Sequence, residues 1–170
     1  MCQNHCTTAI QAPQTQLAIH LPDWINDLVD WHQPLHSDDE KMALAIELAK
    51  QNVLRGTGGP FASIIVHRES GALLSVGVNQ VVAQNNSTLH GEVMAIMLGE
   101  QRLQQFSLGS QIDEYELFTS CEPCAMCMGA ILWSGVKLLA CAATGDDARA
   151  IGFDEGPVFE QSYDYLRNAG

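Results

Sequence analysis

The chain has 170 residues, the usual size of one compact domain. A hydrophobic fraction of 46% can fill a core and excludes an intrinsically disordered chain, and no apolar run approaches the roughly 20 residues that span a bilayer. Eight Lys and Arg against 20 Asp and Glu give a net charge of −12, which repels phosphate backbones. We therefore expect no membrane span, and the charge disfavours a nucleic acid as partner.

The N-terminal part of the chain differs in pattern from the rest. We expect residues 1–37 to form an arm and residues 38–170 to form the main domain. Within the arm, residues 21–34 predict a short helix, because apolar side chains from Trp24 to Trp31 recur at helical spacing. The first ten residues lack the basic start and apolar stretch of a secretory signal, so a cytoplasmic protein is expected.

The first element of the main domain is a helix with a recognisable start. Ser37 predicts the N-cap, and Glu40 three residues on completes a capping box. A break at residues 56–60 ends this helix. Its apolar stripe is expected at Met42, Ala45, Ile46, Ala49 and Val53.

Strands and helices alternate over the rest of the chain. Strands are expected at 61–66, 73–82, 115–119 and 137–143, and helices at 90–103, 123–134 and 146–151. A turn at Ser70 and Gly71 joins the first two strands into a hairpin. This order predicts an α/β fold, namely a three-layer α/β/α sandwich around a central mixed sheet of about five strands.

Potential metal ligands begin two of the expected helices, His90 in one and Cys124 and Cys127 in the other. Two thiolates and an imidazole are ligands that zinc favours, and three protein ligands leave a fourth position open for water. Cys124 and Cys127 project from one helix face, and the positive end of the helix dipole favours their thiolates. Pro123 suits the first helical position. The pattern predicts one catalytic zinc per chain.

Glu92 is the candidate proton carrier beside this site. A carboxylate there can take a proton from water and return it to a substrate, if burial or negative charge raises its pKa towards neutrality. His-x-Glu followed by Pro-Cys-x-x-Cys is the known signature of zinc-dependent nucleobase deaminases. A structural zinc or free thiols are the alternative for the same residues.

The other cysteines are interpreted differently. Cys121 would be a fourth thiolate that closes the open position, so we leave it out of the ligand set. Cys141 lies in an apolar strand and is predicted to be a small buried hydrophobe. Six cysteines without an export signal indicate reduced thiols or metal ligands rather than a disulfide framework.

Residues 38–157 resemble the cytidine deaminase-like superfamily, and within it the guanine deaminase branch. Besides the two metal motifs, the resemblance rests on residues 59–62, residues 77–81, Trp133 and residues 150–155. The last segment discriminates between branches, because cytidine deaminases and tRNA adenosine deaminases share the zinc motifs but do not typically carry a Gly-Phe-Asp-acidic segment there.

The resemblance implies a role for each matching residue. It makes His90, Cys124 and Cys127 the zinc ligands, Glu92 the proton shuttle and Glu155 a second acid against the substrate's amino group. The implied base contacts are Asn79, the backbone N–H of Gly91, and the pocket walls Phe61, Trp133 and Phe153.

The implied activity is hydrolysis of a free nucleobase, guanine, to xanthine and ammonia by a homodimer. In the family the C-terminal segment crosses to the partner subunit and covers its active site. Here the chain ends at residue 170, 15 residues after Glu155, so a shortened cover is expected.

Alternatives stay open at this point. Phe61 and Trp133 could pack in the core, Asn79 could form a strand-end turn, and Glu155 could be an exposed acid. The same chemistry could act on cytosine, an ammeline-like triazine or a tRNA adenosine, although residues 152–155 argue against tRNA. A non-catalytic zinc-stabilised binding module is the alternative of another class, and the intact Glu92 argues against it.

Overall fold

A computed structural model describes residues 15–109, 114–153, 156 and 159–169 of the chain. Its sheet has the strand order β2-β1-β3-β4, in which β3 and β4 are parallel and the other neighbours antiparallel. The strands are β1 (Ala62–His67), β2 (Leu73–Val78), β3 (Tyr115–Cys121) and β4 (Leu138–Ala143). The mixed α/β class is confirmed, but the described sheet has four strands and not five, because the chain turns into helices after β4.

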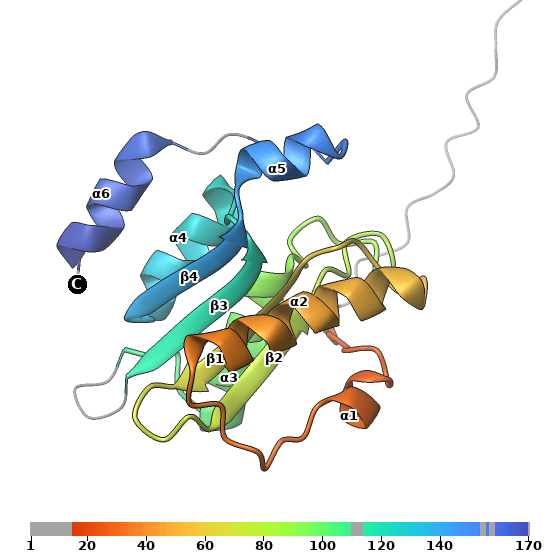
Figure 1. The fold of residues 1–170 in the computed structure, drawn as a ribbon, viewed down its shortest axis with the longest axis horizontal. Helices are drawn as coiled ribbons and strands as arrows, with labels where there is room; N and C mark the ends of the chain where they lie inside the picture. The colour runs from red at the N-terminus through yellow and green to blue at the C-terminus, as the bar shows by residue number, and fades with distance from the viewer. Residues whose placement is uncertain (1–14, 110–113, 154–155, 157–158, 170) are drawn as a thin grey trace, which may run out of the picture.

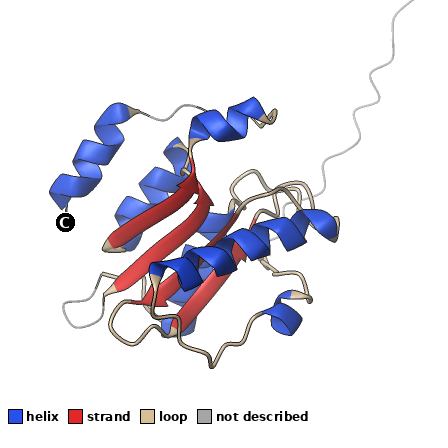
Figure 2. Ribbon diagram, viewed as in Figure 1, coloured by secondary structure: helices blue, strands red, loops and turns tan. Residues whose placement is uncertain are grey.

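Helices cover both faces of this sheet and make three layers (Figures 1 and 2). They are α1 (Ile25–Leu28), α2 (Asp38–Leu54), α3 (Gly91–Leu103), α4 (Ala125–Ser134), α5 (Gly145–Ala150) and α6 (Glu160–Ala169). In Figure 1, α2 lies on one face of the sheet and α3 and α4 lie on the other. The sequence patterns did not predict α6, and none of the helices in the described ranges is long and apolar enough to cross a bilayer.

The buried face of α2 differs from the predicted stripe. The capping box of Ser37 and Glu40 is confirmed, with Ser37 Oγ accepting from the Glu40 N–H at 3.2 Å. However, Ile46 and Val53 are 46% and 48% exposed, whereas the face against the sheet consists of Lys41, Ala45, Leu48, Ala49 and Asn52. The predicted stripe is rotated about the helix axis relative to the buried face. The reason is that two polar residues, Lys41 and Asn52, belong to the buried face and interrupt its apolar period.

Lys41 is buried because it has an acidic partner. Its Nζ lies 2.7 Å from the Glu116 carboxylate on β3 and 5.2 Å from the centroid of the Phe118 ring. A charged group taken out of water is tolerated only when it is paired and hydrogen-bonded. This ion pair therefore fixes the position of the first part of α2 over the sheet.

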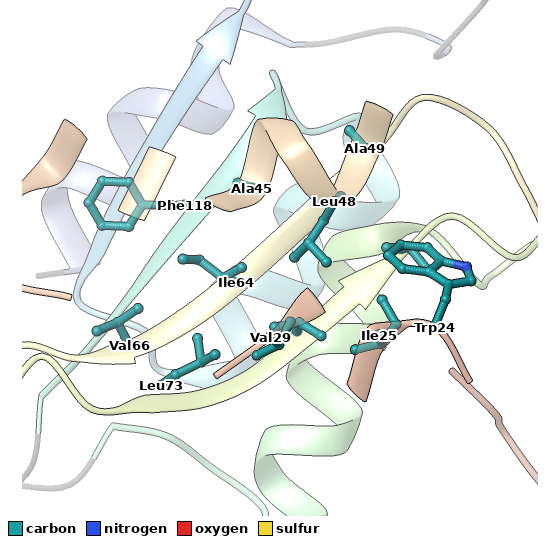
Figure 3. Packing of buried hydrophobic residues seen from close by; sticks show 13 residues of the cluster. Trp24, Ile25, Val29, Ala45, Leu48, Ala49, Ile64, Val66, Leu73 and Phe118 are labelled. Carbon is teal, nitrogen blue, oxygen red and sulfur yellow. The ribbon is translucent and has the colours of Figure 1, made fainter. Parts of the chain in front are cut away.

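Part of the N-terminal arm belongs to the same core as α2. Trp24, Ile25 and Val29 are buried in a cluster with Leu48 and Ile64 (Figure 3). Within the predicted 21–34 segment, only the four residues of α1 are helical. Beyond them the chain is tied to the hairpin through a hydrogen bond from the Leu35 N–H to Gly71 O of 2.8 Å.

A second cluster lies on the other face, where Ile65 and Leu117 from the sheet meet Ala95 of α3 and Ile131 of α4. Gly77 of β2 allows this close approach, since a Cβ there would stand 2.0 Å from the Gly91 carbonyl oxygen at the start of α3. The absence of a side chain at Gly77 thus brings the first turn of α3 directly onto the sheet.

The open edge of the sheet corrects one expectation. β4 is one of the two edge strands, and Cys141 within it is exposed instead of buried. Every residue of a strand is buried only where both faces of the strand are covered. The α2 helix packs mainly on β1 and β3, so it leaves part of β4 uncovered. The α5 and α6 helices follow this edge strand (Figure 1).

Candidate active site

Two helix starts bring the predicted metal ligands together. His90 is the N-cap of α3 and Cys124 the N-cap of α4, both with extended backbone, and Cys127 lies in the first turn of α4. Pro123 therefore precedes the N-cap and does not occupy the expected first helical position. The ligand atoms of His90, Cys124 and Cys127 all lie within 4.8 Å of one another, and Cys124 Sγ is 3.7 Å from His90 Nδ1.

This cluster fits zinc. Zinc–ligand bonds of about 2.0 Å to nitrogen and about 2.3 Å to sulfur place neighbouring ligand atoms about 3.5 to 3.8 Å apart in a tetrahedron. The ligand-atom separations are of this order, and the donor set of two thiols and one imidazole is the kind that zinc prefers. Within the described ranges this is the only such cluster of three or more ligand residues.

A hydrogen bond between the two ligand cysteines shifts the pKa of each in opposite directions. Hydrogen bonding from the Cys127 thiol lowers the pKa of Cys124 to about 4, and the neighbouring His90 contributes in the same direction. The same hydrogen bond to Cys124, together with burial, raises the pKa of Cys127. Because zinc binds cysteine as the thiolate, loading a divalent metal on both sulfurs would release protons.

Glu92 lies in the first turn of α3 and is only 6% exposed. Burial raises the pKa of its carboxyl to about 7, partly offset by a hydrogen bond from its own backbone N–H and by nearby His90. The Cys127 side chain also hydrogen-bonds to it, which places the carboxyl beside the ligand cluster. A carboxyl with a pKa near neutrality can both accept and deliver a proton at physiological pH.

Cys121 remains outside the cluster. Its thiol donates to the Thr144 carbonyl at 3.6 Å, at the start of α5, and it is not among the three grouped ligand residues. This placement agrees with a three-ligand set rather than one closed by a fourth sulfur.

Three of the predicted base contacts, Asn79, Phe61 and Phe153, lie close together. The Asn79 N–H donates to the Phe61 carbonyl at 2.9 Å, and the Phe61 and Phe153 rings meet edge to face with centroids 5.3 Å apart. Phe153 is 38% exposed, so the pair retains open ring surface. The turn interpretation of Asn79 also holds, because its Oδ1 accepts from the Val81 N–H at 3.4 Å.

The remaining predicted residues have different placements. A Cβ at Gly91 would lie 3.0 Å from the Ala62 Cα, so the tight contact of α3 with β1 favours glycine there. Trp133 is 85% exposed, which excludes the core interpretation, and within one chain its ring does not wall an enclosed pocket. Glu155 lies outside the described residues, and its contact with the substrate stays a prediction.

Sequence reasoning missed Glu122, which precedes the cysteine motif. Its carboxylate accepts from the Gly145 N–H of α5 at 2.7 Å and from the Tyr163 hydroxyl of α6. It thereby joins the end of β3 to both C-terminal helices. The available signal was a charged residue directly before the Pro-Cys-x-x-Cys motif.

Known proteins share both the sequence and the fold of this chain. Residues 35–143 match the model of the cytidine and deoxycytidylate deaminase zinc-binding region. A guanine deaminase from Bacillus subtilis is 40% identical over 117 residues, which cover 69% of this chain and 71% of that protein. The chain belongs to the cytidine and deoxycytidylate deaminase family. Its three-ligand cluster lies inside the matched zinc-binding region, so the cofactor of this deaminase is zinc.

Solved structures give the same assignment for the fold. A guanine deaminase from Nitrosomonas europaea is 38% identical and has a TM-score of 0.86, with 94% of this chain and 87% of that chain covered. A mutant protein solved in complex with 8-azaguanine has the same identity, TM-score and coverage.

By sequence, a tRNA-specific adenosine deaminase from Haemophilus influenzae is more distant, at 31% identity over 68% of this chain and 63% of that protein.

Proposed function

We propose that this deaminase hydrolyses guanine to xanthine and ammonia, and so acts in purine metabolism. The observation that carries the proposal is the cluster of His90, Cys124 and Cys127 with the buried carboxyl of Glu92 beside it. Guanine is favoured over other bases by the similarity to the guanine deaminases of Bacillus subtilis and Nitrosomonas europaea and to a protein that binds 8-azaguanine. The net charge of −12 disfavours a polyanionic tRNA.

His90, Cys124 and Cys127 would hold the metal, and their two sulfurs balance its charge. When bound, zinc would supply a Lewis acid that lowers the pKa of the attacking water. Glu92 takes the proton of the attacking water and transfers it to the ring nitrogen next to the amino-bearing carbon. Its pKa of about 7 leaves it able to act in either direction.

Completion of the reaction needs a second proton. The C–N bond breaks with its electron pair on nitrogen, so the amino group leaves as ammonia once a proton has been delivered to it. Glu92 can carry that proton from the newly formed hydroxyl, and Glu155 accepts a hydrogen bond from the amino group and orients it. One water is consumed, and one xanthine and one ammonia are formed.

Base recognition falls to groups outside the metal centre. Phe61 and Phe153 hold the face of the planar ring, and the Asn79 amide matches a donor and an acceptor on its edge. The backbone N–H of Gly91 lies at the start of α3, where such groups have no partner within the helix. It donates to the base beside the reacting carbon.

We also propose that the deaminase is a cytoplasmic homodimer. Apolar side chains are exposed on α4 and α6, above all Trp133, and a groove of about 440 Å³ between these helices includes Met128, Leu132 and Tyr165 in its lining. A second copy would cover this surface and convert Trp133 into a buried residue. A reducing compartment would keep the thiols of Cys124 and Cys127 available as metal ligands.

The test is ammonia release from guanine, adenine, cytosine, ammeline and adenosine, with zinc measured in the same sample. We expect one zinc per chain and the highest kcat/KM on guanine. Turnover of cytosine with none of guanine would overturn the substrate assignment, and zinc-loaded protein that acts on none of these compounds would support a binding module.

A further inference from the structure

Asn52 is a fully buried amide at the C-terminal end of α2, with 0% of its surface exposed. Its side-chain nitrogen donates to two backbone carbonyls, Gly59 O at 2.8 Å and Asn79 O at 3.0 Å. These acceptors lie 7 and 27 residues further along the chain. One side chain therefore joins the end of α2 to both segments that carry proposed base contacts.

The oxygen of the same amide is also occupied. It accepts from the Thr57 hydroxyl at 2.8 Å and from the Gln80 side-chain nitrogen at 3.3 Å. An asparagine amide has two donor hydrogens and an acceptor oxygen with two lone pairs, so its full capacity is used. A buried amide is costly unless it is satisfied in this way, whereas an aliphatic residue would fill the apolar face of α2 without that requirement.

The two segments joined by Asn52 are in close contact. A Cβ on Gly58 would stand 1.9 Å from Asn79 O and 2.6 Å from Asn52 Nδ2, so only glycine fits there. The side-chain nitrogen of Gln80 adds a hydrogen bond to Thr57 O of 2.8 Å. Backbone and side chains together hold residues 57–59 against residues 79–80.

This polar cluster continues to the proposed site in two directions. Through Gly59 it reaches Phe61, whose carbonyl accepts the Asn79 N–H at 2.9 Å. Through Gln80, whose N–H donates to Leu89 O at 2.9 Å, it reaches the residue directly before His90. The placement of the base-binding side chains relative to the metal ligands thus depends on these bonds.

We propose that Asn52 is a positioning residue for base recognition, which sets the Asn79 edge and the Phe61 wall against the metal centre. This inference rests on the proposed function for its effect on KM. It assigns no chemistry to Asn52, because protein groups occupy the nitrogen and the oxygen of its amide. Its loss should therefore weaken substrate binding and leave the proton transfer by Glu92 intact.

The main experiment replaces Asn52 by Leu, which has a similar size but no hydrogen-bonding atoms, and by Asp, which keeps the shape but turns two donors into acceptors. Asn52→Leu should raise KM for guanine about 10-fold, the equivalent of about one buried hydrogen bond, with kcat changed less than about 2-fold and zinc content unchanged. Asn52→Asp should raise KM more, since its oxygens face the carbonyls of Gly59 and Asn79.

Two control variants separate positioning from general destabilisation. Gln51→Leu makes the same amide-to-alkyl change one residue away, where the amide donates to Glu47 and accepts from Arg55, both on α2 or its C-cap. Val66→Ala shortens a fully buried side chain at the far end of β1. Neither should change KM by more than about 2-fold, and an equal rise in KM for Val66→Ala would contradict the proposal.

A double-mutant cycle tests the route of the effect. Because Asn52 is proposed to set both Asn79 and Phe61, Asn52→Leu should raise KM by a smaller factor in an Asn79→Ala background than in the wild type. Fully additive effects on the free-energy scale would overturn the proposal.

Amide hydrogen exchange gives a readout that needs no activity. Asn52→Leu should reduce protection at the amides of Gly58, Asn79 and Gln80 by more than about 10-fold relative to Val66→Ala at the same temperature. Unchanged protection would overturn the positioning role. If the wild type does not act on guanine, the proposed function fails, and the exchange measurement still decides whether Asn52 holds these segments.

Discussion

The metal centre and the proposed base-binding region of this protein are built in different ways. The metal centre uses residues within the first turns of two helices, and both of its cysteines are buried. The absence of a side chain at Gly77 brings one of these helices, α3, directly onto the sheet. The proposed base-binding region uses the loop residues Asn79 and Phe153, which are partly exposed. Asn79 is held by a long-range hydrogen bond from Asn52, and Phe153 by a ring contact with Phe61. The first arrangement fixes reacting groups tightly, and the second leaves specificity open to change by substitution in loops.

The comparison predicts that changes in the metal centre affect turnover and changes in the base-binding region affect affinity. Removal of the proton carrier should have the largest effect. Glu92→Gln should lower kcat by about 10⁴-fold, because the buried amide cannot exchange protons with water and substrate. Ammonia release and zinc content measure this directly.

Zinc content of Glu92→Gln should remain at one per chain, since the three ligands are untouched, and thermal unfolding should still be cooperative. Substantial turnover by the variant would show that another group carries the proton, and the assigned mechanism would be wrong.

Glu155→Gln should have the second largest effect. We expect kcat to fall by about 100-fold with a smaller change in KM, because its carboxylate is needed as ammonia departs rather than for holding the ring. Steady-state kinetics on guanine separate the two parameters. An unchanged rate would reduce Glu155 to a surface acid.

The metal centre was predicted from the sequence because its information is local. His90 and Glu92 are two residues apart, Cys124 and Cys127 are three apart, and each pair begins a helix whose start the pattern indicated. Only the position of Pro123 was wrong, because α4 begins at Ala125, two residues after the expected helix start. Local spacing carries such a site because helix geometry alone decides where the side chains point.

The α2 helix shows where local patterns fail. Its inner face was misassigned because Lys41 and Asn52 are buried polar residues, and each is stabilised by partners from distant parts of the chain. No periodicity reveals that Glu116 or Asn79 will meet them in space. Cys141 failed for a related reason, since an apolar run does not tell whether its strand lies at the centre or at the edge of the sheet.

In the base-binding region we expect a smaller effect from removing an aromatic wall. Phe153→Ala should raise KM for guanine about 3- to 10-fold with little change in kcat, because it removes a ring contact and the edge-to-face partner of Phe61. Phe153→Leu, which retains apolar bulk, serves as the matched control. A change confined to kcat would place Phe153 with the reacting groups instead.

The smallest effect on chemistry should come from Trp133. Trp133→Ser should weaken self-association by more than about 10-fold, since large aromatic residues dominate interface energetics, while kcat per chain stays nearly unchanged at high protein concentration. Sedimentation across a dilution series measures the association. A variant that remains as dimeric as the wild type would remove Trp133 from the interface.

Zinc removal tests the central claim most directly. Protein stripped with a chelator should release no ammonia from guanine, and titration with zinc should restore turnover in proportion up to one ion per chain. Metal uptake should release protons and weaken as the pH falls, because both sulfurs must be deprotonated to bind. Full activity of a preparation that contains no metal would contradict the account.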